Sequence, residues 1–221
     1  MTRIAILNPV KDTGAVPMQA LASYAQPGII LEPMFLDHGP SSIENEADVA
    51  ACTPHVLELG SRLAESGVDA IIVNCMCDPG VAQLRARCAI PVLGPAEAAM
   101  HYAAGLGLHF AVIDVVEGVE VEVRAQVRDF GVGHAFAGYW SIKVPVLALH
   151  TDPVRTVEAL AAASRLAADA GATAILLGCT GLADLADMLA ERLFLEGVRC
   201  SVIEPLRVTI GLAALAAAGH H

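Results

Sequence analysis

Short apolar runs alternate along the chain with longer segments of helical periodicity. Runs typical of buried strands lie at 4–7, 29–36, 70–73, 91–93, 110–113, 144–149, 174–177 and 201–203. Apolar residues recur every three or four positions at 54–66, 154–170 and 182–195, and alanine-rich helical segments lie at 97–106 and 206–218. Strands that alternate with helices in this way predict βαβ units and mainly parallel sheets.

The two halves of the chain repeat this pattern. The segment GVDAIIVNC at 67–75 aligns with GATAILLGC at 171–179 at a constant offset of 104 (171 − 67). The strand from residue 4 aligns with that from residue 110 at an offset of 106 (110 − 4), and VLGP at 92–95 aligns with VIEP at 202–205 at an offset of 110 (202 − 92). We therefore expect an α/β fold of two pseudo-symmetric lobes.

The lobes are expected to comprise residues 1–105 and 106–205, with the helix at 206–218 completing the first. Each would be a mainly parallel sheet flanked by helices. No Pro/Gly/Ser-rich linker separates the halves, so we expect the active site in the cleft between them.

Two helix starts are also predicted from an N-cap residue followed by proline, at Thr53-Pro54 and Asp78-Pro79.

The charge balance narrows the expected partners. There are 24 acidic and 13 basic residues, which gives a formal net charge of −11. That charge repels phosphate backbones and anionic lipids, so we expect a small-molecule substrate and no nucleic-acid or membrane partner. No apolar run reaches the roughly 18 residues of a membrane span, and the start of the chain lacks a signal-peptide layout. A cytoplasmic location is expected.

Two of the six cysteines occupy matching places in the repeat. Cys75 and Cys179 each follow a predicted strand and precede a predicted helix. Ligands gather at the carboxyl ends of parallel strands, and a helix amino terminus stabilises a thiolate. The alternative is that both are small buried hydrophobic residues, but that gives no reason for cysteine in both halves. We interpret Cys52, Cys88 and Cys200 as packing residues.

Two such thiols fit one kind of reaction especially well. Inversion of a carbon acid needs a base on one face of the stereocentre and a proton donor on the other, and the two exchange roles with the direction of reaction.

Six histidines are scattered without a metal or nucleophile pattern and are expected to be surface or core residues: His38, His55, His101, His109, His134 and His150. No phosphate-binding glycine loop or metal-ligand spacing occurs, so no cofactor and no metal are expected.

Several motifs resemble those of hydantoin racemases, within the wider aspartate/glutamate/hydantoin racemase superfamily. CMCDPG at 75–80 and LGCTGL at 177–182 are similar to the two cysteine motifs of that family. Further matches occur in order along nearly the whole chain: NP at 8–9, GPSSIE at 39–44, GPAEAA at 94–99, VPVL at 144–147 and IEP at 203–205.

The resemblance implies a cofactor-independent racemase or epimerase in which Cys75 and Cys179 are the acid/base pair. It implies a 5-substituted hydantoin, or a related ureide such as allantoin, as substrate, and it suggests a possible homo-oligomer. It also places a set of residues around the substrate: Asn8, Ser42, Ile43, Met76, Cys77, Thr180 and Gly181. The backbone amides after each cysteine are suitable donors to the oxyanion of an enolate, and Thr180 alternatively acts as a plain helix cap.

The chain departs from the family pattern at three places. Lys11 ends a segment that usually reads Asn-Pro-Asn-Thr, Asp114-Val115 replaces a Thr-Thr pair, and Gly118-Val119 replaces Arg-Ser. We expect Asp114 either to pair with Lys11 or to bind a cationic or NH-rich part of the substrate, so Asp114 joins the substrate-binding candidates. The alternative is that Asp114 caps a following turn.

Three other functions remain open on the sequence. One is an amino-acid racemase of the aspartate or glutamate type, and another is a cis–trans isomerase of the same superfamily, in which a cysteine adds to the substrate. The third is a non-catalytic small-molecule-binding protein, because a fold alone does not establish activity.

Overall fold

The computed structural model describes residues 1–14 and 20–219, in two compact units. Unit 1 comprises Met1–Ala98 and the segment from Leu206 onwards, and unit 2 comprises Ala99–Pro205. Each contains a four-stranded parallel sheet, with strand order β2-β1-β3-β4 in unit 1 and β6-β5-β7-β8 in unit 2. The identical order confirms the two parallel-sheet halves that the sequence repeat predicts.

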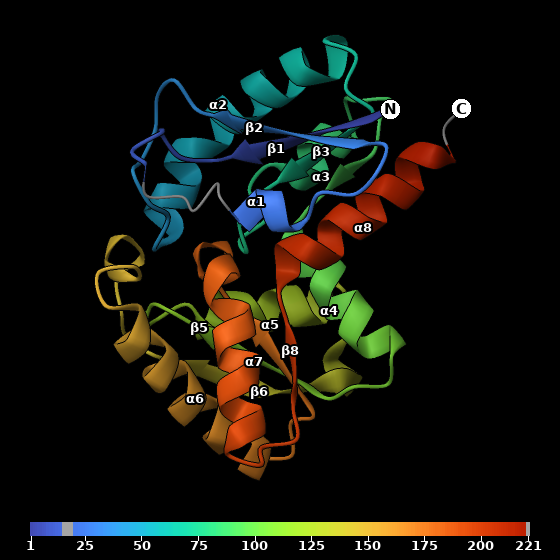
Figure 1. Ribbon diagram of the computed structural model, residues 1–221. Helices are drawn as coiled ribbons and strands as arrows, with labels where there is room; N and C mark the ends of the chain where they lie inside the picture. The colour runs from blue at the N-terminus through green and yellow to red at the C-terminus, as the bar shows by residue number, and fades with distance from the viewer. Residues whose placement is uncertain (15–19, 220–221) are drawn as a thin grey trace. The chain divides into compact units, whose positions relative to one another are not determined.

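Unit 1 is built from the elements at the blue-to-green end of Figure 1 and from the carboxy-terminal helix drawn in red. The strands are β1 (Thr2–Asn8), β2 (Ile29–Phe35), β3 (Ala70–Val73) and β4 (Val92–Leu93). The helices are α1 (Ala20–Ser23), α2 (Glu46–Glu65), α3 (Val81–Arg85) and α8 (Pro205–Ala218). Helix α4 (Pro95–Gly105) begins in this unit, and the division of the chain falls within it.

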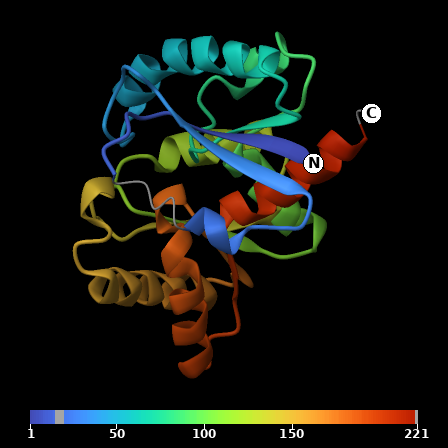
Figure 2. The same ribbon diagram turned by 45° about the horizontal axis from the view of Figure 1, so that its top comes forward.

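Helices cover both faces of the unit 1 sheet. Alternate side chains of β1 and β3 pack on opposite faces, as the two-residue period of a strand requires. Ala5, Leu7, Ile71 and Val73 form a core with α2 and α3, whereas Ile4, Ile6, Ala70 and Ile72 form a core with α1 and α8. Figure 2 shows α2 on one side of this sheet and α1 and α8 on the other. The central strands are therefore buried on both sides, which explains their continuous apolar runs.

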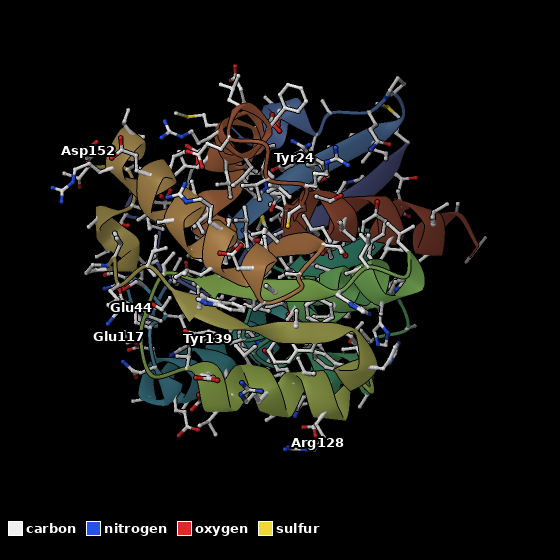
Figure 3. The ribbon with its side chains drawn as sticks, turned by 90° about the horizontal axis from the view of Figure 1, so that it is seen from below. Tyr24, Glu44, Glu117, Arg128, Tyr139 and Asp152 are labelled. Atoms are coloured by element: carbon white, nitrogen blue, oxygen red, sulfur yellow. The ribbon has the colours of Figure 1, made fainter. Side chains whose placement is uncertain are left out.

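Unit 2 repeats this order of elements. Its strands are β5 (Phe110–Asp114), β6 (Phe136–Ser141), β7 (Ala174–Leu177) and β8 (Ser201–Ile203). Its helices are α5 (Glu120–Asp129), α6 (Pro153–Asp169) and α7 (Ala186–Leu195), with short 3₁₀ turns η1 (Gly133–Ala135), η2 (Val146–Ala148) and η3 (Thr180–Leu185). Ala111, Ile113, Ile175 and Leu177 pack on α6 and α7. Figure 3 shows Arg128 of α5 and Asp152 at the start of α6 on opposite sides of the sheet.

One predicted strand is wrong. Residues 144–149 form the turn η2 and its flanks, and the fourth strand of the sheet is β6 at the edge. Pro145 lacks the N–H that a paired strand needs, and it precedes the turn. The strand β6 was missed because it contains Gly138, and glycine is not typical of a strand interior. Glycine is required there because φ is 150° and because a Cβ would overlap the Trp140 ring.

One predicted helix start is also wrong. Helix α2 begins at Glu46 and contains Pro54 in its interior, whereas Thr53 and Pro54 were expected to begin it. The N-cap is Asn45, whose side chain accepts a hydrogen bond from the Asp48 amide at 3.0 Å. Glu46 and Asp48 add negative charge to the first turn, where the helix dipole favours it. The helix therefore begins at this cap and not at the Thr-Pro pair, which lies inside it.

Asp78 does not cap the helix that follows it. The residue before α3 is Gly80, which makes no side-chain cap. The Asp78 carboxylate instead accepts hydrogen bonds from the amides of Ala96 at 3.1 Å and Glu97 at 3.0 Å, in the first turn of α4. Gly94, just before α4, has no side chain, and a Cβ there would overlap the Asp78 carboxyl group. A distant aspartate thus supplies the cap that the local sequence of α4 lacks.

This contact predicts a strong effect of Gly94→Ala. The added methyl group displaces the Asp78 carboxylate, so we expect overpacking and a lost cap to reduce the free energy of unfolding by about 1–3 kcal/mol. Thermal and urea unfolding measure the change. Gly105→Ala, at the other end of α4, is the matched control, because nothing lies within 4 Å of a Cβ there. Equal stability of the two variants would contradict the prediction.

Candidate active site

Cys75 and Cys179 occupy equivalent turns in the two units. Each stands two residues beyond the end of a central strand, β3 or β7, and is partly buried. The Asp78 amide donates to the Cys75 carbonyl at 3.0 Å, and the Leu182 amide donates to the Cys179 carbonyl at 3.1 Å. Both cysteines are therefore the first residue of a four-residue turn closed by the same hydrogen bond. The predicted register of the two cysteines is confirmed at the level of backbone structure.

The four backbone amides singled out in the sequence are the central residues of these turns. Met76 and Cys77 lie between Cys75 and Asp78, and Thr180 and Gly181 lie between Cys179 and Leu182. The closing hydrogen bond of such a turn uses the N–H of its fourth residue, not those of the two central ones. The four amides therefore belong to the turns that begin at the two cysteines but take no part in their closing hydrogen bonds.

Asn8 is fully buried at the carboxyl end of β1 and is held within unit 1. Its side-chain NH₂ donates to the carbonyls of Ile6 at 3.2 Å and Met34 at 3.1 Å. Its side-chain oxygen accepts from the Asn74 amide group at 2.9 Å. Because Asn74 directly precedes Cys75, this network joins the ends of the two central strands behind the thiol. Asn8 is therefore a structural anchor of the segment that carries Cys75.

Asp114 takes the place of Asn8 in unit 2. It is buried at the end of β5, and its Oδ1 accepts from the amides of Val115 at 2.6 Å and Val116 at 3.4 Å. Burial raises the pKa of this carboxyl to about 6. A Cβ on Gly178 would lie 2.9 Å from Oδ2 and 2.8 Å from the Asp114 Cα. Glycine ahead of Cys179 therefore leaves the room that Asp114 requires.

The turn-capping alternative for Asp114 is thus present in the structure, but it uses only one carboxylate oxygen. Among the residues that the structure describes, Oδ2 has no hydrogen-bond partner. Nearby, the Tyr139 hydroxyl donates to the Val116 carbonyl at 2.8 Å; Figure 3 labels this side chain. Burial, and then the charge of Asp114, raise the pKa of Tyr139. The turn cap thus accounts for Oδ1 of Asp114 and not for Oδ2.

Ser42 and Ile43 lie in the loop that leads into α2. The Ser42 hydroxyl donates to Glu44 at 3.1 Å, and Ile43 packs on the core beneath α2. The neighbouring loop is joined to this one by backbone hydrogen bonds from Lys11 to Pro40 at 3.1 Å and from Leu36 to Val10 at 3.0 Å. Within unit 1, the loop after β1 and the loop before α2 therefore lie side by side. A pairing of Lys11 with Asp114 stays a prediction.

The other cysteines have different surroundings. Cys52 is fully buried, and burial raises the pKa of its thiol to about 11. Burial also raises the pKa of the Cys88 and Cys200 thiols, and Cys200 donates to the Ala172 carbonyl at 3.2 Å. These three thiols stay protonated near neutral pH, as packing residues do.

Sequence reasoning overlooked His150. Its ring Nε2 lies 3.0 Å from the Gly181 carbonyl oxygen, and its Nδ1 lies 3.4 Å from Asp184 Oδ2. Nothing in the local sequence distinguishes it from the other histidines, because its partners lie more than 30 residues away. Only the packing of the end of η2 against η3 places this ring beside the Cys179 turn.

The described residues contain neither a cluster suited to a metal ion nor a helix suited to cross a membrane. Over 1–14 and 20–219, no three or more His, Cys, Asp or Glu side chains group so as to hold a metal ion. In the same part of the chain, every helix is too short or too polar to cross a membrane.

The comparisons with known proteins identify the family of the chain. Residues 13–213 match the family model described as Asp/Glu/Hydantoin racemase. The chain is 31% identical to the hydantoin racemase of Paenarthrobacter aurescens over 220 residues, 96% of this chain and 89% of that protein. It is 35% identical to the hydantoin racemase of Rhizobium meliloti over 153 residues, 69% of this chain and 64% of that protein.

Among solved structures, the allantoin racemase from Klebsiella pneumoniae superposes with a TM-score of 0.89 at 29% identity, covering 99% of this chain and 89% of that one. The chain therefore belongs to the Asp/Glu/hydantoin racemase family. It is accordingly an isomerase of the racemase class.

The surroundings of Asp78 predict how stability varies with pH. Burial raises the pKa of this carboxyl to about 7, although the amides of Glu97 and Ala96 lower it. An unfolded aspartate has a pKa of about 3.9, so the folded protein binds the proton more tightly. The contribution of Asp78 to the free energy of unfolding is therefore greatest below about pH 4, falls as the pH rises from about 4 to about 7, and is level above that.

Urea unfolding of the wild type and of Asp78→Asn between pH 4 and pH 8 measures this effect. In the wild type, we expect Asp78 to make the free energy of unfolding fall by up to about 1.4 kcal/mol per pH unit in that window, and we expect this fall to be absent from the variant. Asp169→Asn, at an exposed carboxyl at the end of α6, is the matched control. Parallel curves for the wild type and Asp78→Asn would show that this carboxyl does not titrate as expected.

Proposed function

We propose that the protein inverts the stereocentre of a 5-substituted hydantoin, or of a related ureide such as allantoin, with Cys75 and Cys179 as an acid/base pair. The observation that carries the proposal is that each unit holds a cysteine at the first position of the same turn. The names of the relatives, hydantoin racemase and allantoin racemase, support the substrate class. No cofactor is needed, because two thiols supply both proton transfers.

In the proposed reaction, the stereocentre binds with one thiol on each of its faces. The thiolate of one cysteine removes the α-proton, and the electron pair of the broken C–H bond moves onto the adjacent carbonyl as an enolate. The thiol of the other cysteine then gives its proton to the opposite face of the carbon. In the reverse direction the two cysteines exchange roles, as equal turns permit.

The enolate oxygen needs hydrogen-bond donors in place before the proton leaves. The amides of Met76 and Cys77 in unit 1, and of Thr180 and Gly181 in unit 2, are proposed for this task because they directly follow the two cysteines in the turns. Backbone donors aimed at developing charge contribute several kcal/mol to catalysis. Ser42 and Ile43 are proposed to line the substrate pocket, whereas Asn8 acts through its bond to Asn74.

Asp114 supports a ureide over an acidic amino acid as substrate. At neutral pH a carboxyl with a pKa of about 6 is mostly ionised. An anion at this place repels the second carboxylate of aspartate or glutamate, but it accepts a hydrogen bond from a ring N–H. We assign this role to the unpartnered Oδ2 of Asp114.

Exchange of the α-proton in deuterated buffer, followed by proton NMR, tests the proposed mechanism. Enantiopure 5-substituted hydantoins, allantoin, aspartate and glutamate form the panel. For the accepted class, we expect Cys75→Ala and Cys179→Ala each to lower the rate of racemisation by about 10²- to 10⁴-fold, because each removes one proton-transfer group. Each variant should still exchange the proton of one enantiomer.

Cys88→Ala and Cys200→Ala are the matched controls, because they remove thiols that burial keeps protonated. Wild-type racemisation by either Cys75→Ala or Cys179→Ala would refute the two-thiol mechanism. Exchange of aspartate or glutamate alone would assign the chain to the amino-acid racemases. If the folded protein exchanges the α-proton of no substrate in the panel, a binding role is favoured.

Steady-state kinetics of Asp114→Asn test the substrate contact. Loss of a charged hydrogen-bond acceptor is worth about 1.5–3 kcal/mol, so we expect KM for the ureide to rise by about tenfold or more with little change in kcat. Asp129→Asn, on the exposed end of α5, is the matched control. Unchanged kinetics on every substrate of the panel would contradict the assignment.

A further inference from the structure

His150 joins two segments of unit 2 behind the Cys179 turn. Its Nε2 lies 3.0 Å from the Gly181 carbonyl oxygen, and its Nδ1 lies 3.4 Å from Asp184 Oδ2. The ring is partly buried, and Asp184 lies on the solvent side. The histidine therefore stands between a carboxylate at the surface and a peptide of the site.

Both partners of His150 are hydrogen-bond acceptors only. A backbone carbonyl and an ionised carboxylate have no proton to give, so a hydrogen bond to either needs an N–H on the ring. The tautomer with its hydrogen on Nε2 donates to the Gly181 carbonyl, while Nδ1 faces the Asp184 carboxylate at 3.4 Å.

The peptide that His150 holds lies against the sulfur of Cys179. A Cβ on Gly181 would stand 3.4 Å from Cys179 Sγ and 3.4 Å from Leu149 Cδ1. The Gly181 carbonyl faces His150, and the N–H at the other end of the same peptide, on Leu182, donates to the Cys179 carbonyl. This peptide is therefore fixed at both ends, which sets the orientation of the whole turn.

His150 is itself held in place. Leu149, just before it, is fully buried, and its carbonyl accepts a hydrogen bond from the buried Thr156 hydroxyl at 2.9 Å. Thr156 belongs to the first turn of α6. A rigid helix thus supports the histidine, and the histidine supports the turn.

We propose that His150, held by Asp184, is a positioning residue for Cys179: it anchors the Gly181 carbonyl and so aligns the Cys179 thiol and the amides of Thr180 and Gly181 with the substrate. This inference rests on the proposed function of Cys179. The Cys75 turn is supported differently, by the Asp78 carboxylate on the amides of α4. A defect at His150 should therefore affect one thiol and leave the other unchanged.

Three variants test the proposal. His150→Phe keeps a ring but removes both polar contacts, His150→Gln retains an N–H donor for the Gly181 carbonyl, and Asp184→Asn removes the negative charge that lies beside Nδ1. His134→Phe is the matched control, at an exposed histidine in η1. Racemisation kinetics and the rates of alkylation of Cys75 and Cys179 by iodoacetamide, resolved by mass spectrometry, are measured on each.

We expect His150→Phe to lower kcat by about 10- to 100-fold with KM little changed, as small misplacements of catalytic groups do. His150→Gln should recover most of this loss, and Asp184→Asn should fall between His150→Gln and the wild type. Alkylation of Cys179 should slow several-fold in His150→Phe, with the Cys75 rate unchanged. A merely structural role would slow or accelerate both thiols together and would not be rescued by glutamine.

The outcomes separate this inference from the proposed function. If Cys179→Ala racemises at the wild-type rate, the two-thiol mechanism fails, and the role of His150 fails with it. If Cys179→Ala is inactive but His150→Phe matches His134→Phe in kcat, only the role of His150 is overturned. The ratio of the two alkylation rates needs no substrate, so an unchanged ratio in His150→Phe overturns the positioning role by itself.

Discussion

In each unit two central strands pair in parallel, β1 with β3 and β5 with β7, and both are covered on both faces. Their paired residues are fully buried, Ile4, Ile6, Phe110 and Ile175 among them. Full burial of such side chains contributes about 1.5–3 kcal/mol each, so the register of these strands is strongly specified. Because parallel strands end at one edge, the same pairing brings the Asn8–Asn74 contact and the Asp114–Gly178 contact to the edge that carries the cysteines.

The repeat in the sequence predicts this framework well, because buried strands and helices leave a periodic pattern in the residues themselves. The central strands, the parallel sheet in each half and the matching places of Cys75 and Cys179 after those strands follow from it, whereas the strand order and the turns come from the structure. The edge strand β6 was missed because Gly138 and a following apolar run around Pro145 blur the pattern there.

The contacts of Asp78 and His150 could not be predicted, for a different reason. The Asp78 carboxylate caps a helix that begins 17 residues later (95 − 78), and His150 contacts Gly181, 31 residues away. Such contacts are set by tertiary packing and have no local periodicity. The candidate substrate contacts at Ser42, Ile43 and Asp114 stay predictions, because they depend on a ligand rather than on the fold.

Helix α8 follows the last strand of unit 2 in the chain, yet its side chains Leu206, Ile210 and Ala213 pack on the sheet of unit 1. On the ribosome the amino-terminal sheet therefore emerges first, but the part of its apolar face that α8 covers stays exposed until residues beyond 206 have been made. The part of the protein that is synthesised first is completed last. A nascent chain of this kind exposes hydrophobic surface for most of its elongation, so it depends on prompt arrival of its final helix, or on a chaperone, to escape aggregation.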